Sequence, residues 1–183
     1  MRGVEPEKEG VARTHDRSKN GPDLLGTCAG KAFADDGAAA LVFGLDQALS
    51  FLLEAGDFGA VLGFASADYA TMQLANLHLG VVNVPLQANA PTGQHVAIIA
   101  ETEPRVLAAS IELIDAAVDA VLGGTWPPRL VVFDYEPRDD GHLEKLEAAR
   151  ARLQAADCPI VVDILQGVIA RGKVGPSVPP HVP

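Results

Sequence analysis

The chain has 183 residues, of which 48% are hydrophobic and only 5% aromatic, and its formal net charge is −10. That length suffices for one compact domain, whose core must be built from Ala, Val, Leu and Ile. An acidic surface repels phosphate backbones and anionic lipids, so the composition argues against nucleic acid and membrane surfaces as partners.

The two cysteines, Cys28 and Cys158, are far apart and match no metal spacing, which favours reduced thiols over a disulfide framework. Residues 1–20 are charged throughout and lack the apolar core of a signal peptide. No run of about 18 apolar residues occurs. We therefore expect a cytoplasmic protein without a membrane span.

Three regions of the chain differ in composition and hydrophobic pattern. Residues 1–44 are expected to be poorly ordered or unrelated to the rest, residues 45–171 to form the domain, and residues 172–183 to be a Pro-rich tail. Apolar residues recur at helical spacing over Leu45–Glu54, which predicts a helix that stops at Gly56.

Short apolar runs then alternate with helical patterns. Strands are predicted at Gly59–Phe64, Val81–Val84, Arg105–Ala109, Arg129–Phe133 and Ile160–Asp163. Helices are predicted from Ser66 or Asp68 to His78 or Leu79, and over Thr92–Ala100, Ile111–Leu122, His142–Ala155 and Ile164–Arg171. Pro85 is expected to close the second strand because proline cannot donate a ladder hydrogen bond. The alternation predicts an α/β fold, a mostly parallel sheet with helices on both faces.

A sheet of this kind raises the hypothesis of a nucleotide site, but the phosphate-binding motifs are missing. No predicted strand is followed by G-x-G-x-x-G. Gly26–Lys31 resembles a Walker loop with one residue too few between its glycines and no strand before it. Ser66 does not lie in G-x-S-x-G, so we expect it to cap a helix. Gly123 and Gly124 precede no serine that a phosphopantetheine arm could modify.

The remaining polar candidates favour structural roles. None of the five histidines pairs with another at metal-ligand spacing: His15, His78, His95, His142 and His181. The segment ends that carry His78 and His95 could meet at one sheet edge, but a satisfied structural role is favoured for each. The acid pairs Asp35–Asp36 and Asp139–Asp140 are expected to face water, and Cys158 to be a small buried hydrophobe. The residues alone thus indicate an α/β domain with no catalytic apparatus.

An ordered series of phrases identifies a family. These phrases are Gly63-Phe64-Ala-Ser66-Ala-Asp68-Tyr69, Leu79-Gly80-Val-Val-Asn-Val84-Pro85-Leu86-Gln87, Ala90-Pro91, Glu101-Thr102-Glu103-Pro104 and Leu130-Val-Val-Phe133-Asp134-Tyr135. The series, which covers about two-thirds of the chain, resembles the N-terminal subdomain of the adenylation domain of carboxylic acid reductases. That family is closely related to the fatty-acyl-CoA ligases.

The resemblance implies an acyl-activating chemistry in which ATP and Mg²⁺ convert a carboxylic acid into an acyl-adenylate, and a phosphopantetheine or CoA thiol then takes the acyl group. The family's phosphate loop, ending in Pro-Lys-Gly, and its catalytic lysine have no match here. No catalytic, cofactor-binding or metal-binding residue is therefore assigned. We expect an incomplete subdomain that is inactive alone, binds none of these cofactors by itself, and has the missing part of the adenylation domain as its partner.

The first 55 residues lack the Thr-Tyr…Glu-Leu phrase of relatives, which suits a gene remnant or a split gene. A different hypothesis is a freestanding α/β binding or scaffold module, with Gln87, Asn89 and Ser110 lining a cleft at the carboxyl edge of the sheet. A relative of the short-chain oxidoreductases is disfavoured because the glycine fingerprint is absent.

Overall fold

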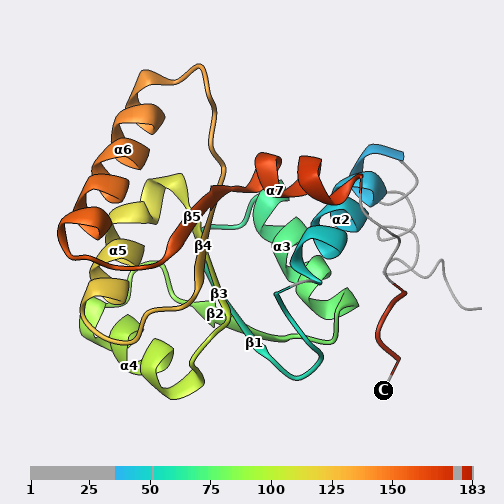
Figure 1. The fold of residues 1–183 in the computed structure, drawn as a ribbon, viewed down its shortest axis with the longest axis horizontal. Helices are drawn as coiled ribbons and strands as arrows, with labels where there is room; N and C mark the ends of the chain where they lie inside the picture. Colours follow the sequence, from blue (N-terminus) through green and yellow to red (C-terminus); the bar gives the residue numbers. More distant parts are fainter. Residues whose placement is uncertain (1–35, 51, 175–178, 183) are drawn as a thin grey trace, which may run out of the picture.

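The structure is a computed structural model that describes residues 36–50, 52–174 and 179–182. Five parallel strands form one sheet in the order β2-β1-β3-β4-β5 (Figure 1). The strands are β1 (Phe58–Leu62), β2 (Val82–Leu86), β3 (Val106–Ser110), β4 (Arg129–Phe133) and β5 (Val161–Ile164). The predicted α/β fold is confirmed, and each apolar run of the sequence became a strand.

The helices alternate with the strands as predicted. They are α2 (Asp36–Leu49), α3 (Ala67–His78), α4 (Thr92–Thr102), α5 (Ile114–Leu122), α6 (Asp140–Ala155) and α7 (Leu165–Gly172), with a 3-10 turn η1 (Ile111–Leu113) before α5. No helix in the described part of the chain has both the length and the apolar character that a membrane crossing needs.

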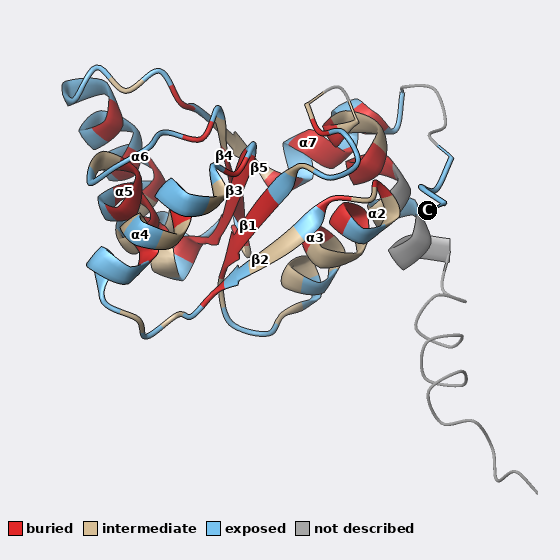
Figure 2. Cartoon of the chain, turned by 90° about the horizontal axis from the view of Figure 1, so that it is seen from below, coloured by how far each residue is buried: buried red, intermediate tan, exposed pale blue. Residues whose placement is uncertain are grey.

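The helices form two layers, one on each face of the sheet (Figure 2). On β3, Leu107 and Ala109 point into the core beneath α4, α5 and α6, whereas Val106 and Ala108 point into the core beneath α2, α3 and α7. Because side chains alternate along a strand, a run that is apolar at every position is suited to a strand covered on both sides. The central strand β3 is buried at all five positions.

The layer of α2, α3 and α7 depends on a close approach of two helices. A Cβ atom added to Gly172 at the end of α7 would lie 1.6 Å from the carbonyl oxygen of Gly44 in α2. A Cβ atom on Gly44 would in turn lie 2.9 Å from the carbonyl oxygen of Ile169. Only glycine at these positions lets the two backbones come this close.

Several predicted boundaries need correction. The helix predicted over Leu45–Glu54 begins at Asp36 and ends at Leu49, so α2 crosses the expected boundary at residue 44. β2 runs through Pro85 to Leu86 instead of stopping before it. β2 is an edge strand, and there a proline removes no ladder hydrogen bond. The tail also makes one described contact, because the backbone N–H of His181 donates to the carbonyl of His78 at 2.8 Å.

Candidate functional site at the carboxyl edge of the sheet

The carboxyl ends of the parallel strands meet at one edge, where α/β sheets usually bind ligands. Of the three side chains predicted to line a cleft there, Gln87 and Asn89 are exposed, but Ser110 is buried with 3% of its surface accessible. Ser110 therefore belongs to the core and does not line an open cleft. Gln87 has a structural task as well, since its carbonyl oxygen lies 2.9 Å from Nε2 of the buried His95.

The middle of this edge is held by Asp68. Its Oδ2 atom accepts a hydrogen bond from the backbone N–H of Asp134 at 2.9 Å and lies 3.4 Å from Nε2 of Gln166. Asp134 has a left-handed backbone, with φ of 54°. One carboxylate thus joins the first turn of α3, the end of β4 and the first turn of α7. The contact with a backbone amide indicates that Asp68 fixes the sharp turn after β4.

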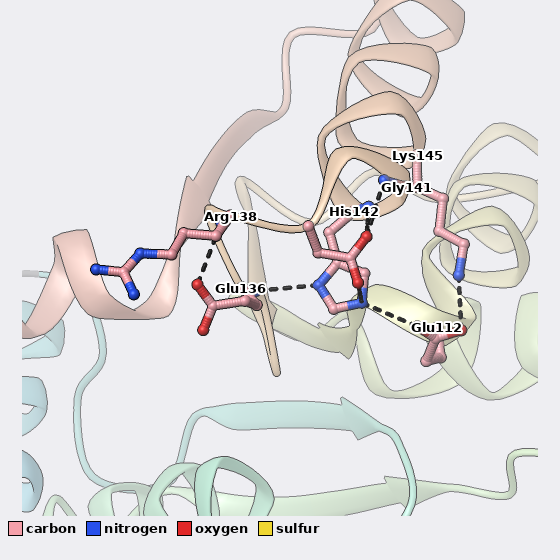
Figure 3. A network of polar contacts seen from close by, with 7 residues as sticks. Glu112, Glu136, Arg138, Gly141, His142 and Lys145 are labelled. Carbon is pink, nitrogen blue, oxygen red and sulfur yellow. Dashed lines mark hydrogen bonds and ion pairs between the residues drawn. The ribbon is translucent and has the colours of Figure 1, made fainter.

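A polar network on this edge surrounds His142, in the first turn of α6 (Figure 3). The backbone N–H of Glu136 donates to its Nδ1 at 3.0 Å, so the ring proton resides on Nε2. Nε2 then faces Oε1 of Glu112 at 3.1 Å. Lys145 contacts Oε2 of the same carboxylate at 2.6 Å. A neutral imidazole satisfies both of its contacts, which leaves it no free nitrogen for proton transfer.

Charge at this edge opposes an anionic ligand. The hydrogen bond from Lys145 is the main reason why the pKa of Glu112 lies below its usual value, so this carboxyl is ionised at neutral pH. Oδ1 of Asp139 accepts hydrogen bonds from the backbone N–H groups of Gly141 and His142, and Asp139 so caps α6. The guanidinium of Arg138 points away from His142 (Figure 3). Carboxylates therefore dominate the edge, and its lysine is already paired.

The other predicted sites have structural roles in the described residues. Ser66 caps α3 by accepting from the backbone N–H of Tyr69, as predicted. His78 and His95 do not meet: His78 ends α3 in one layer, and His95 lies in the first half of α4 in the other. Both have structural roles, as expected: His78 contacts Asp46, and Nε2 of His95 contacts the carbonyl of Gln87, although the buried Nδ1 of His95 has no hydrogen-bond partner among the described residues. Cys158 is a half-buried thiol against the core, and Gly123 ends α5.

The remaining candidates fall outside the described residues: Gly26–Lys31, His15, Cys28 and Asp35. Among residues 36–50, 52–174 and 179–182 no cluster of three His, Cys, Asp or Glu residues is arranged to hold a metal ion. The carboxylates near His142 are engaged by Lys145 and by backbone amides, so they do not fit Mg²⁺ as a ligand set.

Sequence reasoning missed a polar contact between two helices and a hollow at the opposite edge. Nδ1 of His78 lies 2.7 Å from Oδ2 of the buried Asp46 on α2. A hollow of about 600 Å³ at the amino edge of the strands is lined by residues that include Phe58, Arg105 and Trp126. No local motif marks either feature, because each joins residues from separate elements.

No family model matches the sequence. A carboxylic acid reductase of Mycobacterium tuberculosis is 47% identical over 124 residues, which are 68% of this chain and 10% of that protein. A carboxylic acid reductase of Segniliparus rugosus is 45% identical over 126 residues, 69% of this chain and 11% of that protein. The chain thus spans about a tenth of the length of these relatives.

Solved structures agree with these relatives. The A-PCP didomain of the Segniliparus rugosus reductase, in complex with AMP, matches with a TM-score of 0.75 and 40% identity over 78% of this chain and 21% of that one. The adenylation domain of a carboxylate reductase from Mycobacterium chelonae also gives 0.75, at 42% identity over 79% of this chain and 23% of that one. A benzoate CoA ligase from Burkholderia xenovorans, at 14% identity and a TM-score of 0.58 over 80% of this chain and 24% of that one, shares the fold.

Sequence phrases, sheet order and these likenesses lead to one assignment. The chain belongs to the carboxylic acid reductase family, in which it corresponds to part of the adenylation domain.

Proposed function

We propose that this chain forms the opening part of the adenylation domain of an acyl-activating enzyme of the carboxylic acid reductase type. The complete enzyme would use ATP to convert a carboxylic acid into an acyl-adenylate. The 183-residue chain would not catalyse that step alone. The observation that carries the proposal is the match, at 40% identity and a TM-score of 0.75, to an adenylation domain that binds AMP.

The chemistry of adenylation supports a non-catalytic role for this part. Pyrophosphate leaves with a high negative charge, which a site must neutralise with cations and backbone N–H groups. The sequence contains no Pro-Lys-Gly. The carboxyl edge presents carboxylates, and its lysine is held by Glu112. ATP and Mg²⁺ do not fit these residues, so we assign the binding of ATP, Mg²⁺ and the phosphopantetheine or CoA thiol to the remainder of the domain.

The role left to this chain is architectural. Its sheet gives the remainder of the domain a rigid layer, and the bonds of Asp68 and His142 fix the loops at the carboxyl edge. Its partner is the remainder of the adenylation domain, supplied by the same polypeptide or by a separate one.

Two measurements of acid-dependent ATP–pyrophosphate exchange test the proposal. In the first, the purified 183-residue chain is given a panel of aromatic and fatty acids, and no exchange is expected. In the second, this chain replaces the aligned segment of the Segniliparus rugosus adenylation domain, and exchange is expected. Exchange by the chain alone overturns the non-catalytic role. A folded chimera without exchange overturns the assignment to an adenylation domain.

A further inference from the structure

The two helical layers differ in charge. The layer of α4, α5 and α6 carries nine charged residues: Glu101, Asp115, Asp119, Asp140, Glu144, Lys145, Glu147, Arg150 and Arg152. The layer of α2, α3 and α7, of similar length, carries four: Asp36, Asp46, Asp68 and Arg171. A helix surface that faces water is normally rich in charge, so the second layer lacks the usual character of a solvated surface.

Ion pairs confirm that the first layer faces water. Arg152 on α6 contacts Asp115 at 3.2 Å and also pairs with Asp119, both on α5. The hydrogen bond with Asp119 is the main reason why the pKa of Arg152 is raised. Arg150 and Glu147 form a further exposed pair at 3.7 Å. Such exposed pairs contribute little to stability, but they keep this face hydrated.

Helix α3 shows the opposite character. Its inner side buries Met72, Ala75 and Asn76. Its outer side carries Ala67, Ala70, Leu74 and Leu77 at helical spacing, and 68% of Leu77 is exposed. An exposed strip of apolar side chains on a helix whose inner side already packs on the sheet is unusual for a surface that faces water. One side of α3 packs on the sheet, and the other side stays exposed in the part of the chain that the structure describes.

Two large apolar side chains outside α3 are also exposed. Phe64, just before the helix, is 57% exposed, and Leu41 on the neighbouring α2 is 38% exposed. Figure 2 shows α2, α3 and α7 together on one side of the sheet, away from the charged layer. We define the outer face of α3 as Ala67, Ala70, Leu74 and Leu77. Exposed apolar side chains gathered on one helix face are typical of an interaction site.

We propose that the outer face of α3 binds the remainder of the adenylation domain; this rests on the function proposed above. In the solved adenylation domains this chain covers only 21–24% of the polypeptide, so most of the domain lies outside the aligned part. The remainder must pack against this chain to share a fold. The outer face of α3 is where it can do so without burying charge, since unpaired buried charges cost several kcal/mol.

Charge also argues for this occupant over a second copy of the chain. Each copy carries a net charge of −10, so two copies repel one another as they approach. The outer face of α3 has no charged residue of its own that could offset that repulsion. A partner of different composition avoids this cost.

The test measures binding of the full chain to the Segniliparus rugosus adenylation domain from which the aligned segment has been removed. Leu77→Glu places a carboxylate in the middle of the proposed contact. Leu143→Glu is the matched control, because Leu143 is 45% exposed on α6 in the charged layer. We expect Leu77→Glu to weaken binding at least tenfold in sedimentation velocity titrations, and Leu143→Glu to leave the dissociation constant within twofold of the unmodified chain.

Thermal midpoints of both variants establish that the chain remains folded, since both positions are exposed. The proposal is overturned if Leu77→Glu binds as tightly as the unmodified chain, if Leu143→Glu weakens binding equally, or if the unmodified chain does not bind. Self-association that Leu77→Glu abolishes would make a second copy the occupant, which also overturns it. If binding depends on Leu77 but the chimera is inactive, the proposed contact stands and the proposed function is rejected.

Discussion

Oδ2 of Asp46 on α2 and Nδ1 of His78 on α3 are in contact, 2.7 Å apart. Asp46 is almost completely buried, with 1% of its side chain exposed, whereas 18% of His78 is exposed. Since α2 and α3 lie next to each other on one face of the sheet, the pair links neighbouring helices. The backbone contact between His181 and the carbonyl of His78 brings the tail to the same place.

This pair predicts a pH-dependent stability. Burial raises the pKa of Asp46 from 3.8 to about 7 in the folded chain. The folded state therefore holds this proton more tightly than the unfolded state, and the resulting stabilisation is complete below about pH 4 and lost as the pH rises through about 7. Relative to Asp46→Asn, the free energy of unfolding should fall by roughly 2–3 kcal/mol between pH 5 and pH 8.

Urea denaturation of the unmodified chain and Asp46→Asn at both pH values measures that difference. Ionisable groups that the substitution does not affect contribute the same pH dependence to both proteins, so their contributions cancel in the difference. Parallel pH dependences would show that burial of Asp46 does not perturb its ionisation.

The contact between α2 and α7 predicts a large effect of one methyl group. Gly172→Ala would place a Cβ atom 1.6 Å from the carbonyl oxygen of Gly44, so the helices must separate. We expect a loss of about 2–3 kcal/mol in the free energy of unfolding. Gly167→Ala in the same helix is the control, because its nearest contact would be the side chain of Arg171 at 3.8 Å. Alanine there should be neutral or stabilise by up to about 1 kcal/mol. Equal losses in both variants would contradict a role for close helix packing.

The cap of α3 gives a smaller and separate prediction. Ser66 accepts from the backbone N–H of Tyr69 at 3.0 Å, and Ser66→Ala leaves that N–H without its partner. The expected cost is about 1 kcal/mol. Thr71→Ala serves as a control, since the Thr71 hydroxyl only donates to a carbonyl of its own helix. It should change stability by less than about 0.5 kcal/mol. Chemical denaturation of both variants measures these changes in the free energy of unfolding. An unchanged value for Ser66→Ala would show that the Ser66 cap does not stabilise the chain.

The sheet could be predicted from sequence because its strands are continuous apolar runs bounded by turns. Arg129–Phe133 matched β4 at both ends, since proline precedes it and a charged loop follows. The extent of β2 could not be predicted, because whether Pro85 is tolerated depends on the strand lying at the edge. The start of α2 was also missed. Its packing on α7 through Gly44 and Gly172 is a tertiary contact with no local signal.

The polar contacts at the carboxyl edge were less predictable for the same reason. Ser66 followed from local capping chemistry and was confirmed. The triad of Glu112, His142 and Lys145 joins η1 to α6 across about thirty residues of sequence, and the residue types alone do not indicate which glutamate meets the histidine. His78 and His95 were separated by the fold, because α3 and α4 lie on opposite faces of the sheet.

The acidic carboxyl edge predicts that nucleotides do not stabilise the isolated chain. A ligand that binds only the folded state raises the free energy of unfolding by RT ln(1 + [L]/Kd). AMP, ATP or CoA at about 1 mM should therefore shift the thermal midpoint measurably only if its Kd is well below that concentration. We expect no shift with the chain alone, because its carboxylates repel phosphate, and a clear AMP-dependent shift with the chimeric adenylation domain. A shift with the isolated chain would instead favour a freestanding binding module. Gln87→Ala then locates the ligand: the hydrogen bond to His95 uses the backbone carbonyl of Gln87, so this substitution removes an exposed amide from the edge without disturbing that contact.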